Sequence, residues 1–84
     1  MRDHYWGEAV KRCRKKRGLT IRQASQCAGL SPVYWYLIER GILALRLKAF
    51  AKISYAFDKS AADLAREMDE IMPPRMDEKG NWLS

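Results

Sequence analysis

The stretch TIRQASQCAGLSPVYWYLIERG, residues 20–41, carries the signals of two short helices joined by a glycine turn. The hydroxyl of Thr20 is placed to accept a hydrogen bond from the N–H of Gln23, and the Gln23 side chain to accept one from the N–H of Thr20. Gly29 stands where a chain leaving a helix often takes a positive φ, which costs glycine nothing sterically. We therefore predict a helix over residues 21–28.

A second helix is predicted directly after the turn. Ser31 is a good N-cap residue, and Pro32 has a preset φ that suits the first position of a helix. The helix should run over residues 32–40 and end at Gly41. Two short helices at this spacing are typical of a helix-turn-helix motif.

Apolar residues at helical spacing predict three further helices, over residues 5–17, 47–57 and 61–72. Ser60 and Asp63 mark the start of the last helix. The expected fold is therefore all-α, with five helices in one domain over residues 1–72. The buried faces should carry Trp6, Val10, Cys13 and Arg17 in the first of these helices, and Leu47, Phe50, Ala51, Ser54 and Phe57 or their immediate neighbours, with Ile53 central, in the second. In the third, Ala61, Leu64, Ala65, Met68, Ile71 and Met72 form an apolar stripe, and part of that stripe should close the core.

Two proline residues end the last predicted helix, and residues 73–84 read as a polar tail of mixed charge. Trp82 is the one large aromatic residue of this tail. Two interpretations stay open: an incidental exposed side chain, or an anchor that docks on this chain or on a protein partner.

Charge is unevenly distributed over the 84 residues, whose net charge is +6. Residues 1–52 contain twelve Lys or Arg and three acidic residues, a net charge of +9, whereas residues 53–84 contain four and seven, a net charge of −3. The positive charge thus belongs to the helix-turn-helix half, which favours a polyphosphate partner. A solvated basic face that only aids solubility is the simpler alternative.

The short chain bounds the protein to a modest core, so an enzyme with a large cleft is not expected. No run is apolar enough to span a membrane and no signal peptide is recognisable, which indicates a cytoplasmic protein. Cys13 and Cys27 fall at apolar helix positions and are read as reduced core residues, with a redox pair as a minor alternative. His4 is the only histidine and no Cys-x-x-Cys pair occurs, so a metal site is not expected. No cofactor is expected either.

The chain resembles the phage repressor and Cro (Xre-like) family of DNA-binding proteins through three motifs, Gly18-Leu19-Thr20, Gly29-Leu30-Ser31 and Ile38-Glu39-Arg40-Gly41. The resemblance covers about two thirds of the chain. It implies a lambda-repressor-like helix-turn-helix domain whose third helix, residues 32–40, enters the major groove of double-stranded DNA. The implied function is a transcriptional regulator, a dimeric repressor.

The resemblance also implies an ion pair between Arg14 and Glu39. A surface pair would contribute under about 1 kcal/mol, whereas removal of one partner from a buried pair costs about 3–5 kcal/mol. We expect the buried pair, which would fix the tilt of the recognition helix against the first helix.

DNA contacts divide into two expected sets. Residues at the start of the second helix and around the recognition helix should bind phosphates, because helix N-termini and cations attract anions; these are Thr20, Ile21, Arg22, Tyr34, Arg40, Arg46 and Lys48. The outward residues of the recognition helix should read the bases; these are Pro32, Val33, Tyr36 and Leu37.

This reading face departs from the family, which commonly has Gln, Arg, Ser or Asn there. A second departure is Leu45-Arg46 before the fourth helix, where the family often has Pro-Ser, so that helix lacks a serine cap and follows an apolar loop, residues 42–45. The alternative function is therefore a protein-interaction module, antitoxin-like or binding a polymerase subunit or repressor through an apolar patch of Ile21, Val33, Tyr36 and Leu37.

An RNA-binding function has the charge but lacks an aromatic stacking platform. No nucleophile, base and orienting group can be assembled for an enzyme. A homodimer is expected, because two recognition helices related by a two-fold axis match a palindromic site. Its interface is expected at Met68, Ile71 and Met72.

Overall fold

The computed structural model describes residues 2–72, and the predicted tail with Trp82 lies outside the described residues. The described chain forms five helices: α1 (Arg2–Lys16), α2 (Ile21–Ala28), α3 (Pro32–Glu39), α4 (Leu47–Ala56) and α5 (Ala61–Ile71). No strand occurs between residues 2 and 72. The predicted all-α, five-helix fold is confirmed. Helix α1 starts three residues earlier than expected, and α1, α3, α4 and α5 each end one residue earlier than expected.

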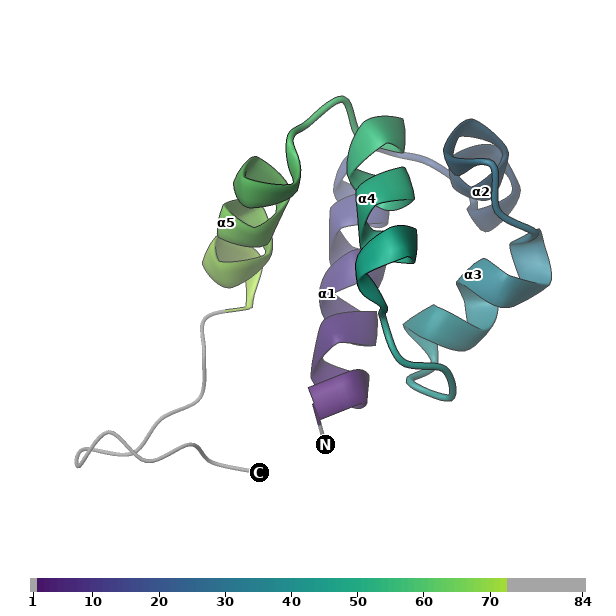
Figure 1. Ribbon diagram of the computed structural model, residues 1–84, viewed down its shortest axis with the longest axis horizontal. Helices are drawn as coiled ribbons and strands as arrows, with labels where there is room; N and C mark the ends of the chain where they lie inside the picture. Colours follow the sequence, from purple (N-terminus) through teal and green to yellow (C-terminus); the bar gives the residue numbers. More distant parts are fainter. Residues whose placement is uncertain (1, 73–84) are drawn as a thin grey trace.

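In the view of Figure 1, α4 lies in front of α1 in the middle of the molecule, with α2 and α3 on one side and α5 on the other. Helix α1 packs against α3 and α5, while α2 packs against α3 and α4. The helix-turn-helix pair is thus attached to both central helices. Helix α5 closes the opposite side of the core.

The predicted punctuation of the helix-turn-helix is confirmed. The N–H of Gln23 donates to the Thr20 hydroxyl at 3.1 Å, and the Thr20 N–H donates to the Gln23 side chain at 2.9 Å. Gly29 has φ of 71°, and the Ser31 hydroxyl accepts from the N–H of Tyr34 at 3.0 Å. Local hydrogen bonds therefore set both ends of the turn between α2 and α3.

The core centres on Trp35 of α3, which is fully buried and meets the ring of Phe57 edge-on at a centroid distance of 5.9 Å. Because Phe57 follows α4, this contact joins α3 to α4. Other apolar residues buried in the core are Ala9, Val10, Cys13, Ala24, Ala28, Ile38, Ala49, Ile53, Leu64 and Met68. Burial raises the pKa of the Cys13 thiol to about 11, and the charge of Glu67 contributes, so this cysteine is a protonated core residue.

Three expectations about burial are wrong. Leu47 is 80% exposed and Ala51 is also exposed, because α4 turns Ala49 and Ile53 toward the core instead. Helix α4 begins after Arg46 without a side-chain cap, as its sequence predicts. Cys27 is exposed, since α2 buries its opposite face.

The expected dimer residues of α5 also need one correction. Met68 is fully buried in the core of the single chain, so its side chain is not free for an interface. Ile71 and Met72 are half-buried and pack against the edge of the same core. In the apolar loop before α4, Leu45 likewise packs on the core, whereas Ile42 is 64% exposed.

A nearly buried carboxylate, Glu67 of α5, joins three parts of the fold. The two terminal nitrogens of Arg17 donate to its oxygens at 2.6 and 2.8 Å, and the Lys59 ammonium lies 2.6 Å from it. The Glu67 side chain is only 2% exposed, and the Arg17 guanidinium also covers the Phe57 ring at 4.4 Å. Hydrogen bonds from Arg17, with a smaller contribution from Lys59, hold the pKa of Glu67 far below its usual value.

Gly7 is the point of closest approach between α1 and α3. A Cβ atom at Gly7 would overlap the main-chain oxygens of Ile38 and Glu39 at the end of α3. Backbone atoms cannot move aside as a flexible side chain does, so α1 and α3 pack this closely only because residue 7 has no side chain.

Gly7→Ala is expected to lower the free energy of unfolding by about 1–3 kcal/mol, because the added methyl group overpacks the contact. In an exposed helix position the same change would stabilise the protein by about 1 kcal/mol. Urea unfolding followed by circular dichroism measures the difference. The control is Lys15→Ala at an exposed position of α1, which should change stability by no more than about 0.5 kcal/mol. A Gly7→Ala protein as stable as the native chain would contradict the close approach.

The Glu67 cluster predicts a loss of stability in acid. Because the pKa of Glu67 is lowered in the folded state, its stabilisation is complete above the unfolded pKa of roughly 4.5 and disappears as pH falls below it. Glu67→Gln should therefore remove part of the decrease in the free energy of unfolding between about pH 5 and pH 2. Asp63→Asn, in an exposed pair with Arg66, is the control and should leave that decrease unchanged. Parallel pH profiles for native and Glu67→Gln protein would refute the assignment.

Candidate nucleic-acid interface

Helix α3 presents one face to solvent along most of its length. Val33 is 68% exposed and Tyr36 is 45% exposed, and Pro32 lies beside them at the start of the helix. Leu37, the fourth residue expected on this face, is half-buried. The structure thus brings three of the four expected base-reading residues onto one open surface and leaves Leu37 at its edge.

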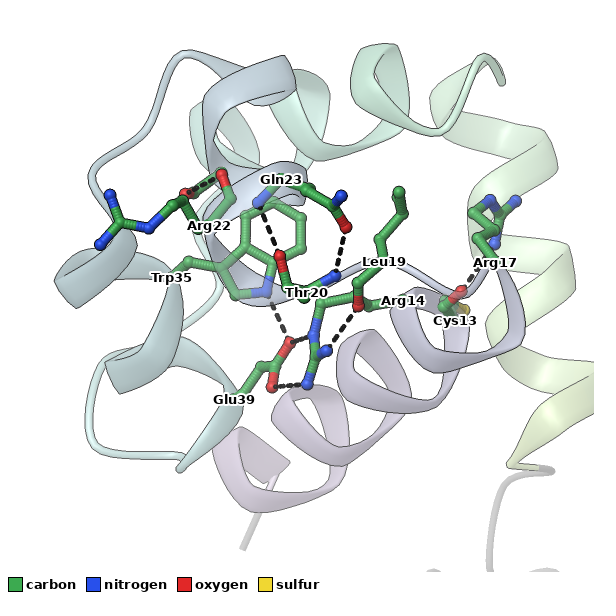
Figure 2. Close-up of polar contacts among 10 residues, drawn as sticks. Cys13, Arg14, Arg17, Leu19, Thr20, Arg22, Gln23, Trp35 and Glu39 are labelled. Atoms are coloured by element: carbon green, nitrogen blue, oxygen red, sulfur yellow. Dashed lines mark hydrogen bonds and ion pairs between the residues drawn. The ribbon is translucent and has the colours of Figure 1, made fainter.

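The opposite face of α3 is held by a polar network inside the protein (Figure 2). The Arg14 guanidinium donates to both carboxylate oxygens of Glu39, at 2.7 and 3.0 Å, and the indole N–H of Trp35 donates to the same carboxylate. Another nitrogen of Arg14 donates to the main-chain oxygen of Leu19 at 2.7 Å. Because the two side chains of the pair are 9% and 4% exposed, the predicted buried ion pair is confirmed.

This network fixes three segments relative to one another. Arg14 comes from α1, Glu39 from the end of α3, and Leu19 from the connection that leads into α2. A planar guanidinium with two parallel hydrogen bonds accepts only a narrow range of orientations. The outward face of α3 is therefore set from within, at the residue just before its C-cap.

The start of α2 offers main-chain donors next to this face. Its capping box engages the N–H groups of Thr20 and Gln23, so those of Ile21 and Arg22 have no partner within residues 2–72. Free N–H groups at a helix N-terminus attract anions, and the exposed Arg22 side chain adds a positive charge there. Ile21 is half-buried against the core, so the main chain rather than its side chain is available.

A shallow pocket with a basic rim lies between the α2–α3 turn and α4. Its lining consists of Leu30, Tyr34, Arg46, Lys48, Ala49 and Lys52. The pocket adjoins the uncapped N-terminus of α4, whose first N–H groups have no side-chain partner. Three expected phosphate contacts meet here, namely Tyr34, Arg46 and Lys48. Sequence reasoning missed Lys52, although its position four residues after Lys48 places it on the same helix face.

The charged side chains around the outward face of α3 are positive and have no carboxylate partner among the described residues. Arg22, Arg46, Lys48 and Lys52 form no ion pair with any carboxylate in the described part of the chain. By contrast, Arg12 pairs with Glu8, and Lys16 and Arg17 pair with Glu67. Unpaired cations keep their full attraction for an external anion. The arrangement therefore suits a polyanion that runs across α3 from the start of α2 to the start of α4.

The apolar patch expected for a protein partner is smaller than the sequence indicated. Ile21 and Leu37 are half-buried, so Val33 and Tyr36 are the members of that patch that are well exposed. Residues 2–72 contain no cluster of side chains that could hold a metal ion. Within the same range, no helix has the length and apolar character needed to cross a membrane.

No protein-family model matches the sequence, and no curated protein matches it. Among solved structures, the chain is similar to the clp gene regulator ClgR from Corynebacterium glutamicum, with a TM-score of 0.72 and 26% sequence identity over 86% of this chain and 94% of that chain. It shares its fold with the restriction-modification controller protein C.AhdI from Aeromonas hydrophila, with a TM-score of 0.69 and 24% identity over 74% of this chain and 94% of that chain. The resemblance to the phage repressor and Cro (Xre-like) helix-turn-helix family is thus confirmed.

Glu39→Gln is expected to lower the free energy of unfolding by about 3–5 kcal/mol, because it leaves the Arg14 charge buried without a counter-charge. Equilibrium unfolding in urea tests this value. Glu8→Gln makes the same chemical change in an exposed pair with Arg12 and should cost under about 1 kcal/mol. Equal losses in the two variants would show that the pair at Glu39 does not hold α3 in place.

Proposed function

We propose that the protein is a sequence-specific DNA-binding transcriptional regulator, a dimeric repressor, that inserts α3 into the major groove. The observation that carries this proposal is the open face of α3 flanked by unpaired cations and free helix N-termini. The similarity to a clp gene regulator supports it, because that chain shares both the fold and about a quarter of the sequence. Positive charge in the helix-turn-helix half agrees with a DNA partner.

In this proposal the phosphate contacts come from two sides of α3. The N–H groups of Ile21 and Arg22 bind one strand at the start of α2. Arg46, Lys48 and Lys52, with Tyr34 beside them, bind phosphates at the start of α4. These contacts position the protein and carry no sequence information. Apolar contacts of Val33 with thymine methyl groups would add discrimination at the bases.

The dimer is part of the proposal. The half-buried Ile71 and Met72, at the C-terminal end of α5, leave apolar surface at the edge of the core. Burial of this surface against a second copy would pair two α3 helices about a two-fold axis, which suits a palindromic site with half-sites one helical turn apart.

One observation favours a second function, binding of a protein through the same end of the molecule. Val33 is 68% exposed, Ile42 is 64% exposed and Leu47 is 80% exposed, which is more apolar exposure than DNA phosphates require. A protein partner would bury these side chains as the centre of an interface. The surrounding cations argue for DNA, since burying them unpaired against an apolar partner is costly.

Binding to duplex DNA is expected to weaken steeply between 50 and 200 mM salt, and Arg46→Ala should weaken it for all sequences alike while lowering the salt slope by about 1. A mobility-shift assay with DNA from upstream of the protein's own gene measures both effects. Arg66→Ala is the matched control, because Arg66 is an exposed arginine of α5 on the other side of the molecule. It should leave affinity and slope unchanged.

Two results would overturn the DNA-binding proposal. One is the absence of any shift at low salt. The other is an equal loss of DNA affinity with Arg46→Ala and Arg66→Ala, which would show that binding depends only on the net charge of the protein. If no shift occurs, Val33→Asp distinguishes the second function, because it should abolish binding of a protein partner.

A further inference from the structure

The Arg40 side chain does not extend away from α3 but folds back over the helix. Its guanidinium carbon lies 5.8 Å from the centre of the Tyr36 ring, and one terminal nitrogen donates to the Tyr36 hydroxyl at 3.3 Å. Residues four apart are neighbours on a helix surface, and helical side chains tilt toward the N-terminus. The Arg40 guanidinium therefore contacts both the ring and the hydroxyl of Tyr36.

This placement puts a cation on the outward face of α3. Val33, Tyr36 and Arg40 are spaced three and four residues apart, so they form one stripe along the helix, and all three are exposed. Arg40 forms no ion pair with a carboxylate of residues 2–72, and Glu39 beside it is buried against Arg14. The guanidinium thus has no carboxylate partner within residues 2–72 and lies on the exposed face of α3.

The rest of that surface has little capacity to read DNA bases by hydrogen bonds. Pro32, Val33 and Leu37 have apolar side chains, and the Tyr36 hydroxyl, which accepts from Arg40, has a single O–H donor left for a base. Only the guanidinium presents several N–H donors in a fixed plane. In the major groove, guanine is the base that offers two adjacent acceptors, O6 and N7, to such a group.

We infer that Arg40 reads a guanine in the major groove and that Tyr36 is the positioning residue that holds its guanidinium over α3. The inference rests on the proposed DNA-binding function and replaces the phosphate contact expected for Arg40 from sequence. A long arginine side chain loses much rotamer freedom when it binds a base, and the contact with Tyr36 restricts that freedom beforehand. The remaining N–H groups of the guanidinium are left for the base.

Selection from a pool of randomised duplexes, followed by affinity measurements on the enriched site, tests this inference. The native protein should enrich a site with a guanine, and replacement of that guanine by 7-deazaguanine, which lacks the N7 acceptor, should weaken binding on the order of tenfold. Arg40→Ala removes the donors, so it should abolish this sensitivity, while affinity for unrelated duplexes should fall only by the loss of one positive charge. Arg66→Ala is the control and should behave as the native protein.

The role of Tyr36 is tested with the same two duplexes. Tyr36→Phe keeps the ring and removes the hydroxyl, so part of the sensitivity to 7-deazaguanine should remain. Tyr36→Ala removes both contacts and should reduce the sensitivity further, with circular dichroism as the check that the exposed substitution leaves the fold intact. Full sensitivity in Tyr36→Ala would overturn the positioning role.

The outcomes separate this inference from the proposed function. If Arg40→Ala enriches the same site with the same sensitivity to 7-deazaguanine, the base contact is wrong although DNA binding stands. If the native protein enriches no site and binds no duplex at low salt, the proposed function and the base contact both fail.

Discussion

The buried pair of Arg14 and Glu39 is the interaction on which the candidate site depends. It is made between α1 and the end of α3, and the same carboxylate also accepts from Trp35, the largest buried side chain. A helix of eight residues is marginal by itself, so its stability and orientation come from tertiary contacts. The polar network supplies the orientation, while the contact of Trp35 with Phe57 supplies apolar burial.

The rest of the structure leaves α3 free at its outer face. Gly7 lets α1 approach the end of α3 closely, so α3 is held at its inner face. Val33 and Tyr36 are exposed, and no described segment covers them. The positive and negative charges are separated accordingly. Cations near α5 are neutralised by Glu67, whereas those at the starts of α2 and α4 have no internal partner. A small all-α core thereby presents one basic end.

Much of the fold could be predicted from local signals. The Thr20 capping box, the φ of Gly29 and the Ser31 cap depend on residues at most three apart, so the sequence is sufficient to place α2 and α3. Positions in the longer helices were less secure. Helical spacing placed Leu47 and Ala51 of α4 in the core, but a helix with apolar residues around most of its surface has no unique buried face until its neighbours are in place. In the short helix α2, Cys27 is exposed because Ala24, Ser25 and Ala28 face the core instead. Met68 was expected at a dimer interface, whereas the packing of α5 against α1 and α4 buries it in the core.

The sequence by itself determined five helices, the helix-turn-helix and a basic N-terminal half, because capping, glycine conformation and charge are properties of near neighbours. Only the tertiary structure decided which cations are neutralised and which are free, since the partners of Glu67 lie up to 50 residues away in the chain. It also decided the direction of the Arg40 side chain. A side chain with four rotatable bonds has no single direction in the sequence, and its surroundings on the folded helix supply one.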